Sequence, residues 1–313
     1  GLVLLAGLLG AGSAAAQADY PNRPIRLVVP FSAGGGNDIV ARMLAKHLDD
    51  ELNTSIVVEN RPGAGGNIGM ASVARARPDG YTLAYVANTV VINPYLYKTV
   101  GFDIQKDFAP VALLATSPVW VLVHPDLPVK SLPELLAYAK AHPGKLSYAT
   151  PGVGTPHHMA AELLKAKSGL DMMHVPYKGA SGAATDVVGG QVPVLIATPA
   201  SVQSFVAAGK LRPLASMDPA RSSAEPDLPT ASEAVPGFAA TIWHGVMAPA
   251  APAIAAKFAA AIRHALENTS LPQELAGVGF APAFEPASDM GARIGRELGV
   301  WADVTRQAGI QPE

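Results

Sequence analysis

Two glycine-rich turns, each placed between an apolar run and a helical pattern, constrain this chain more than any other feature. The first lies within residues 25–48 (IRLVVPFSAGGGNDIVARMLAKHL) and the second within residues 55–76 (SIVVENRPGAGGNIGMASVARA). Glycine lets the backbone approach a ligand closely, and the free N–H groups at the start of a helix, backed by the helix dipole, attract negative charge. The two turns therefore predict a binding site for an anion or a carboxylate.

Apolar, β-rich runs alternate with helical patterns along the chain. The expected strands are residues 25–29, 55–59, 82–86, 111–115, 119–124, 146–149, 173–176 and 192–197. The expected helices are residues 38–52, 67–76, 131–142, 157–169, 180–189, 201–208, 252–268 and 288–308. This order predicts an α/β fold with mainly parallel sheets. Ligands of such folds sit beyond the carboxyl ends of strands, where both glycine turns and a third turn, TPGVGTPHH, are expected.

The first 18 residues (GLVLLAGLLGAGSAAAQA) are typical of a signal peptide that lacks its initiator methionine and basic start. They carry no charge, and the apolar run gives way to small residues that end in an A-x-A signal, so we expect export and cleavage after Ala18. A membrane anchor is the alternative, but the run is shorter than the roughly 20 residues that a spanning helix needs. The 313 residues include no cysteine, which excludes disulfide chemistry and a lipid-anchored cysteine. We expect a free, soluble mature protein.

Length and charge set the class of protein. Residues 19–313 are long enough for two domains. The formal net charge of −2 provides no attraction to nucleic acid or to anionic membranes. Charged residues make up 15% of the chain, while glycine and proline number 30 and 28. With 49% hydrophobic residues, this composition indicates tight turns between short buried elements and not disorder.

The expected strand at 119–124 is interpreted as a crossover into a second domain, and the segment WHGVMAP at 243–249 as the return. The predicted domains are residues 19–120 with 243–313, and residues 121–242, after the signal segment 1–18. Trp120, Trp243 and Trp301 are interpreted as core or hinge packing residues.

Nucleotide binding is the sharpest alternative for the second turn. Gly63, Gly65 and Gly69 lie between a strand and a helix, but the dinucleotide pattern G-x-G-x-x-G needs its third glycine where Ile68 stands. It also needs an acidic residue at the end of the next strand, where the chain has Asn88. Neither turn fits the P-loop pattern. An exported NAD-dependent oxidoreductase therefore remains only a weaker alternative.

The sequence offers few side chains in a pattern suited to catalysis. His157, His158 and Glu162 offer part of a metal site, but no H-E-x-x-H pattern or comparable third ligand accompanies them. The chain has no G-x-S-x-G motif, and a lysine beside a glycine turn, such as Lys178, usually faces solvent. We therefore expect binding without catalysis, and neither a metal nor a cofactor.

A series of phrases in order identifies a family. They run from Tyr20 to about Gly309 and include YPNRPIRLVVPFSAGGGND, VVENRPGAGGNIG, ARPDGYTL, INPYLY, HVPYKG, LPTASEAVPGF and WADVTRQAGI. Together they resemble the substrate-binding proteins of tripartite tricarboxylate transporters, the TctC-like periplasmic receptors also called Bug receptors. The resemblance implies a two-domain periplasmic-binding-protein fold of type II, which closes on its ligand like a flytrap about two crossover hinge strands.

The resemblance also implies a function. Members of the family hold a small carboxylate-bearing ligand with loop N–H groups and ordered waters, without an arginine clamp. That suits the first turn, 31–38, and the second, 63–69, neither of which contains a basic residue. The expected partner is a membrane permease with one large and one small subunit, and a monomeric receptor is expected. A receptor that presents its ligand to a membrane sensor kinase, without transport, is the open alternative.

Matching positions imply ligand-contacting residues in both domains. Asp38 has a structural alternative, because an acidic residue early in a helix complements the dipole whatever the ligand. Asn37 stands where the family often has threonine, which leaves the identity of the ligand open. The implied ligand-binding residues are Phe31, Ser32, Gly34, Gly35, Asn37, Asp38, Gly63, Ala64, Gly65, Gly66, Asn67, Asn88 and Thr89 in the first domain, and Thr150, Gly152, Gly154, Thr155, Asp186 and Thr198 in the second.

Overall fold

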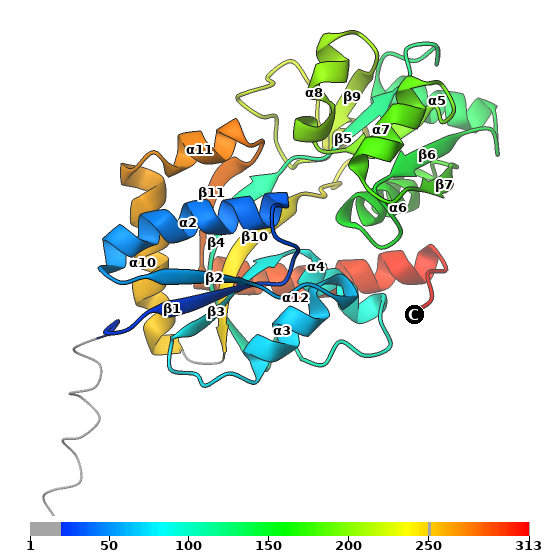
Figure 1. Cartoon of the computed structure of the whole chain (residues 1–313). Helices are drawn as coiled ribbons and strands as arrows, with labels where there is room; N and C mark the ends of the chain where they lie inside the picture. Colours follow the sequence, from blue (N-terminus) through cyan, green and yellow to red (C-terminus); the bar gives the residue numbers. More distant parts are fainter. Residues whose placement is uncertain (1–19, 250–251, 313) are drawn as a thin grey trace, which may run out of the picture.

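The computed structural model describes residues 20–249 and 252–312, arranged as two α/β lobes (Figure 1). The expected signal peptide and its cleavage site lie outside the described residues. None of the helices within the described ranges has the length and apolar character needed to cross a membrane.

A six-stranded sheet forms the first lobe, in the order β11-β4-β10-β3-β1-β2. Its strands are β1 (Ile25–Val29), β2 (Ile56–Asn60), β3 (Thr82–Ala87), β4 (Phe108–Ser117), β10 (Ile242–Pro249) and β11 (Ala281–Pro286). Strand β1 pairs in parallel with β2 and β3, whereas β10 runs antiparallel to both β3 and β4. The parallel half places the carboxyl ends of β1, β2 and β3 at one edge of the sheet.

The second lobe contains a five-stranded sheet in the order β7-β6-β8-β5-β9. Its strands are β5 (Trp120–Val123), β6 (Ser147–Thr150), β7 (Met173–Pro176), β8 (Val194–Ala197) and β9 (Arg212–Ser216). Strand β6 is parallel to β7 and β8, while β5 is antiparallel to β8 and β9. The expectation of mainly parallel sheets is therefore wrong. β5 and β10 follow the passages between lobes, and each enters its new sheet against the direction of the β-α-β strands.

Helices cover both faces of the first sheet. They are α2 (Gly36–Leu52), α3 (Asn67–Ala74), α4 (Thr89–Ile92), α10 (Pro252–Asn268), α11 (Leu271–Gly277) and α12 (Ala287–Gln307), with short 3₁₀ turns η1 (Ala64–Gly66) and η2 (Asn93–Tyr95). Strand β1 is apolar except at Arg26, which pairs with Glu59. Leu27 packs in the cluster that contains Leu44 of α2, whereas Val28 packs in the cluster that contains Met70 of α3. A strand that is buried on both faces needs apolar residues at most of its positions.

The second sheet is covered in the same way. Its helices are α5 (Leu132–Ala141), α6 (Pro156–Ser168), α7 (Ala180–Val188), α8 (Pro199–Ala207) and α9 (Ala231–Ala234). Val121 of β5 packs in the cluster that contains Met159 of α6, and Leu122 packs in the cluster that contains Val202 of α8. Each face of this strand thus contributes to a different hydrophobic cluster.

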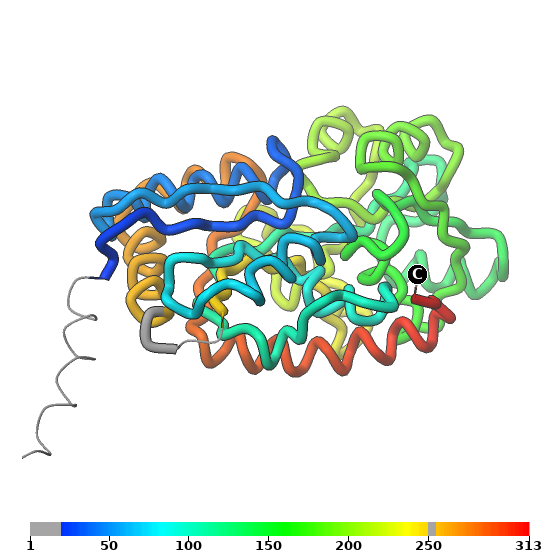
Figure 2. The backbone as a smooth tube through the Cα atoms, turned by 60° about the horizontal axis from the view of Figure 1, so that its bottom comes forward, coloured from blue at the N-terminus to red at the C-terminus, as the bar shows by residue number. Residues whose placement is uncertain are grey.

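Two passages of the chain join the lobes. Pro118 and Val119 connect β4 to β5, and residues 217–241 lead from β9 back to β10. The predicted boundaries after residues 120 and 242 lie beside these passages. Helix α12 also reaches both lobes, because it packs on β4 and contacts α6 (Figures 1 and 2). The indole Nε1–H of Trp243 in β10 donates to Glu297 of α12 at 2.8 Å, which attaches the returning strand to this helix.

Candidate functional site

A cavity of about 690 Å³ lies where loops of the first lobe face loops of the second. Its walls come from the strand ends and helix starts of both lobes, and from the segment that follows α12. The lining residues are Pro30, Phe31, Ser32, Gly36, Asn37, Pro62, Gly63, Gly65, Gly66, Ala87, Thr89, Asn93, Leu96, Tyr97, Ser117, Ile242, His244 and Phe280 of the first lobe, Val153, Gly154, Thr155, Pro156, His157 and Thr198 of the second, and Ile310 and Gln311.

The cavity brings together about half of the residues that the sequence predicted as ligand contacts. Those that line it are Phe31, Ser32, Asn37, Gly63, Gly65, Gly66, Thr89, Gly154, Thr155 and Thr198. The others are not part of the described lining, namely Gly34, Gly35, Asp38, Ala64, Asn67, Asn88, Thr150, Gly152 and Asp186. Several of these residues form hydrogen bonds with other groups of the protein.

Asp38 stabilises the first turn through hydrogen bonds of its buried side chain. Its side chain is 2% exposed and accepts hydrogen bonds from the N–H of Gly34 at 2.8 Å, from Asn60 Nδ2 at 2.8 Å and from Arg42 Nε at 3.0 Å. Burial alone would raise the pKa of Asp38, but these hydrogen bonds outweigh it and hold the pKa below its usual value. The geometry favours the structural alternative for Asp38, which orders the turn between β1 and α2.

The second turn is ordered by an asparagine that the sequence analysis missed. Asn93 Nδ2 donates to the carbonyl oxygen of Gly65 at 3.0 Å and to Asn67 Oδ1 at 2.7 Å. Gly65 has φ +64°, a conformation that favours glycine, and a Cβ at this position would lie 2.7 Å from the hydroxyl oxygen of Tyr97, so a larger residue would strain the turn. Asn93 and Tyr97 therefore fix the path of the turn from the next stretch of chain.

The helices that begin at the cavity start with few side-chain caps. Within the described chain, the caps of α2, α3 and α8 (Gly35, Gly66 and Thr198) show no side-chain hydrogen bond to the first turn. By contrast, Ser131 caps α5, and Thr155 caps α6 by accepting from the N–H of His158 at 3.3 Å. Among the described contacts, the N–H groups of the first turn of α2 have no partner. At α3, by contrast, the N–H of Asn67 donates to the carbonyl oxygen of Ala64, and α8 begins with a proline, so these two helices contribute mainly the positive ends of their dipoles. The cavity wall is thus electropositive without a cation.

No Asp, Glu, Lys or Arg is present among the described residues that line the cavity. Its two histidines are held neutral by burial, which lowers the pKa of His157 to about 4 and that of His244 to about 3. The attraction for an anion at neutral pH therefore comes from backbone N–H groups, helix dipoles and neutral polar side chains of the described lining, and not from a cation. Such donors are fixed in place by the fold.

Two polar side chains meet in the cavity lining where β4 pairs with β10. Ser117 Oγ lies 3.2 Å from His244 Nε2, and both side chains are buried. The imidazole stacks on Tyr85 and meets the ring of Phe280 edge-on, with ring centroids 6.0 and 4.9 Å apart. The sequence analysis missed this pair, although His244 lies in the segment that it interpreted as the return crossover.

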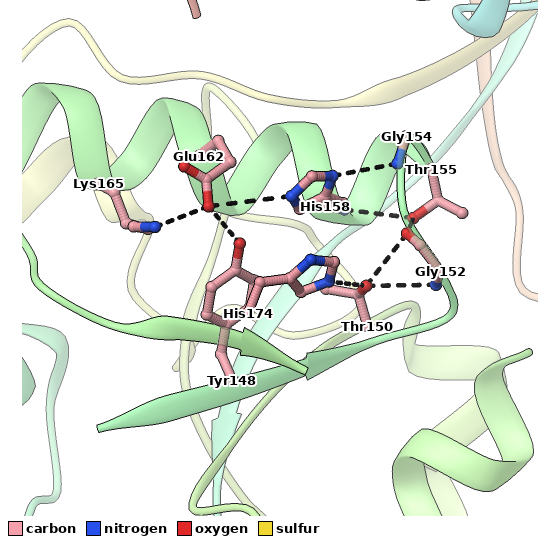
Figure 3. A network of polar contacts seen from close by, with 9 residues as sticks. All are labelled: Tyr148, Thr150, Gly152, Gly154, Thr155, His158, Glu162, Lys165 and His174. Carbon is pink, nitrogen blue, oxygen red and sulfur yellow. Dashed lines mark hydrogen bonds and ion pairs between the residues drawn. The ribbon is translucent and has the colours of Figure 1, made fainter. Parts of the chain in front are cut away.

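A network of polar contacts supports the second-lobe loop (Figure 3). Thr150 Oγ1 accepts from the N–H of Gly152 at 3.2 Å and lies 2.7 Å from His174 Nε2. The N–H of Gly154 donates to His158 Nδ1 at 3.1 Å, and the two imidazoles stack with centroids 3.9 Å apart. The predicted contacts Thr150 and Gly152 are thus used to shape the loop that presents Gly154 to the cavity.

The same network includes Glu162, the carboxylate of the partial metal site that the sequence offered. Glu162 accepts from Tyr148 and from Lys165 Nζ at 2.8 Å, and its Oε1 lies 3.9 Å from His158 Nε2. Across the described residues, no group of three His, Cys, Asp or Glu side chains is placed to hold a metal ion. Asp186 similarly accepts from the hydroxyl of Tyr177 at 2.6 Å on α7.

The two lobes touch at both rims of the cavity through glycines. A Cβ added at Gly154 would lie 2.6 Å from Leu96 of the first lobe. A Cβ added at Gly279, which precedes β11, would overlap Ala200 at the start of α8. The absence of side chains at these positions lets the lobes approach closely.

Comparison with known proteins gives a consistent result. The family model described as "Tripartite tricarboxylate transporter family receptor" matches residues 40–309. Protein BugT of Bordetella pertussis is 35% identical over 297 residues, which cover 93% of this chain and 91% of BugT. This similarity extends over nearly the full length of both proteins.

Two similar solved structures contain bound carboxylates. The structure of R. palustris Rpa4515 with adipate has a TM-score of 0.78 and 33% identity, and the match covers 94% of this chain and 100% of that one. MatC from Rhodopseudomonas palustris with bound malate has a TM-score of 0.71 and 31% identity, covering 91% and 99%. These matches confirm the predicted two-lobed fold of periplasmic binding proteins.

Proposed function

This chain belongs to the tripartite tricarboxylate transporter receptor family, and we propose that it captures a small carboxylate-bearing ligand in the cavity between its lobes. The family consists of periplasmic solute-binding receptors and is not a family of enzymes. The ligand, its contacts and its delivery are the subject of the proposal.

The observation that carries this proposal is the convergence of uncapped helix starts on a cavity lined without a charged side chain, as far as its lining is described. A carboxylate placed there accepts hydrogen bonds from the N–H groups at the start of α2, which have no other partner among the described contacts, and the dipoles of α3 and α8 add to its attraction. Each hydrogen bond to a charged group contributes about 1.5–3 kcal/mol, and each helix dipole adds about 0.3–1 kcal/mol. Adipate and malate, which similar proteins bind, both carry carboxylates.

The ligand docks first on the two glycine turns, around Asn37 and Gly65. Closure of the second lobe then adds contacts from the loop at Gly154 and from Thr198. Closure requires that the ligand bind the closed arrangement more tightly than the open one. A membrane permease with one large and one small subunit recognises the closed receptor and takes up the ligand.

A thermal-shift screen of the protein with mono-, di- and tricarboxylates, amino acids and aromatic acids tests the proposal. A ligand at 100 times its Kd stabilises the folded protein by about 2.7 kcal/mol, so a carboxylate that fits will raise the Tm clearly. A screen in which only nucleotides raise the Tm would overturn the proposal. Uptake of the labelled ligand by cells with and without the permease genes then separates delivery from sensing.

A further inference from the structure

The buried pair Ser117–His244 is a polar element of the cavity that is separate from the helix starts. We propose that this pair determines ligand specificity by binding the distal end of the ligand, and that it selects an uncharged hydrogen-bonding group, such as a hydroxyl or an amide, over a second carboxylate. The inference rests on the proposed function, because it assumes that one carboxylate occupies the helix starts.

The order of the strands separates the two ends of the cavity. Strand β10 lies two positions from β1 in the sheet, and β4 lies three positions from it. Neighbouring strands are about 4.8 Å apart, which places the Ser117–His244 pair about 10–14 Å from β1, across the sheet. The turn after β1 and this pair thus line different parts of the same cavity, and a ligand with a chain of several carbon atoms extends from one toward the other.

The Ser117–His244 pair can form a further hydrogen bond with a ligand. If His244 Nε2 carries the proton and donates to Ser117 Oγ, the hydroxyl hydrogen of the serine remains free to donate to a ligand. If the serine donates to the ring instead, its oxygen keeps lone pairs that accept a hydrogen bond. In both tautomers the pair offers a neutral partner, since the buried ring is uncharged at neutral pH.

A second carboxylate would meet no positive charge at this place. The ring of His244 is held between Tyr85 of β3 and Phe280, and β4 contributes the serine. Tyr85 is the titratable group among these partners, and burial raises its pKa, so it is neutral as well. A carboxylate here would be desolvated without a cation unless His244 took up a proton from solvent.

Calorimetry with four matched ligands tests the inference: hexanoate, 6-hydroxyhexanoate, the monoamide of adipate, and adipate. We expect the hydroxy acid and the monoamide to bind about tenfold more tightly than hexanoate and adipate, which corresponds to about 1.4 kcal/mol or one hydrogen bond. The Kd values of these two ligands should be constant between pH 6 and 8.

Two substitutions test whether Ser117 and His244 cause this selectivity. Ser117→Ala should bring the hydroxy acid to the affinity of hexanoate while the Kd of hexanoate is unchanged. His244→Phe keeps an aromatic ring in place and should abolish the same discrimination. The matched control is Ser168→Ala, which removes a hydroxyl that bonds the carbonyl oxygen of Leu164 on α6, away from the described cavity lining.

The outcomes separate this inference from the proposed function. Adipate binding most tightly, or with an affinity that rises as the pH falls, would show that the pair accepts a carboxylate and would overturn the inference alone. So would a Ser117→Ala variant that weakens all four ligands equally. If none of these or other carboxylates binds, the carboxylate site itself is refuted, and the inference with it.

Discussion

The N–H groups at the start of α2 can be tested by removing one without disturbing the helix. Gly36→Pro deletes the N–H of the first helical residue, a position at which proline is well tolerated. The preceding residue, Gly35, has φ −78° and ψ 165°, an extended conformation that a residue before proline prefers. Helices α6 and α8 already begin with Pro156 and Pro199, so the substitution copies a start that this protein uses.

The expected loss is that of one hydrogen bond to a carboxylate. Such a bond is worth about 1.5–3 kcal/mol, and about 1.4 kcal/mol corresponds to a tenfold change, so the Kd should rise by about 10- to 150-fold. Part of any change could come from the new Cβ, which would lie 3.3 Å from the ring of Phe280. Gly36→Ala has the same Cβ and retains the N–H, and it is therefore the matched control.

Isothermal titration calorimetry with the carboxylate that gives the largest thermal shift measures the effect. The Gly36→Pro variant should bind at least tenfold more weakly than Gly36→Ala, and the two ligand-free proteins should have similar Tm values. Equal Kd values for the two variants would refute the reasoning, because the N–H at this position would then make no contact with the ligand.

Three further predictions concern the rest of the cavity. Burial lowers the pKa of His244 from 6.5 to about 3, so the unfolded chain takes up the proton at a higher pH than the folded protein does. The contribution of His244 to stability should be constant above pH 6.5 and fall by up to about 1.4 kcal/mol per pH unit from there toward pH 3, and His157 and His174, whose pKa values burial also lowers, add to the total slope. In urea unfolding, His244→Phe should remove only the part of the slope that His244 contributes. His158→Phe keeps the stacking but loses the acceptor for the N–H of Gly154, worth about 1 kcal/mol, so ligand affinity should fall about fivefold in calorimetry; an unchanged Kd would contradict the supporting role of the ring. Gly279→Ala should hold the lobes apart, seen as weaker ligand binding and a larger radius of gyration in X-ray scattering. Gly237→Ala, which has a similar positive φ but no neighbour within 4 Å of the new Cβ, should change neither; equal effects of the two substitutions would mean that backbone strain, and not the contact with Ala200, is responsible.

The sequence predicted the strands and helices whose apolar pattern is strong. β1, for example, is buried on both faces and was expected at its observed bounds. The edge strands β9 and β11 were missed, because Pro213, Pro282 and Pro286 interrupt them and prolines weaken a strand pattern. The direction of pairing was also wrong. The two crossovers were expected, but no local pattern shows that β5 and β10 pair antiparallel with their neighbours.

The glycine-rich parts of the candidate site could be predicted from the sequence. The glycine turns around Asn37 and Gly65 do line the cavity. The pair of Ser117 and His244 was missed because its members are 127 residues apart and meet only through the pairing of β4 with β10. Asp186 was expected near the cleft, but its carboxylate is bonded to Tyr177 and it is absent from the described lining.

The tryptophans of this protein form an intrinsic optical probe. The chain has three, and all are buried: Trp120 begins β5 just after one passage between lobes, Trp243 follows the other, and Trp301 lies on α12, which contacts both lobes. None of the three is part of the described cavity lining. A change in emission on adding ligand would thus report movement of the hinge, so the kinetics of closure can be followed by stopped-flow fluorescence without a label.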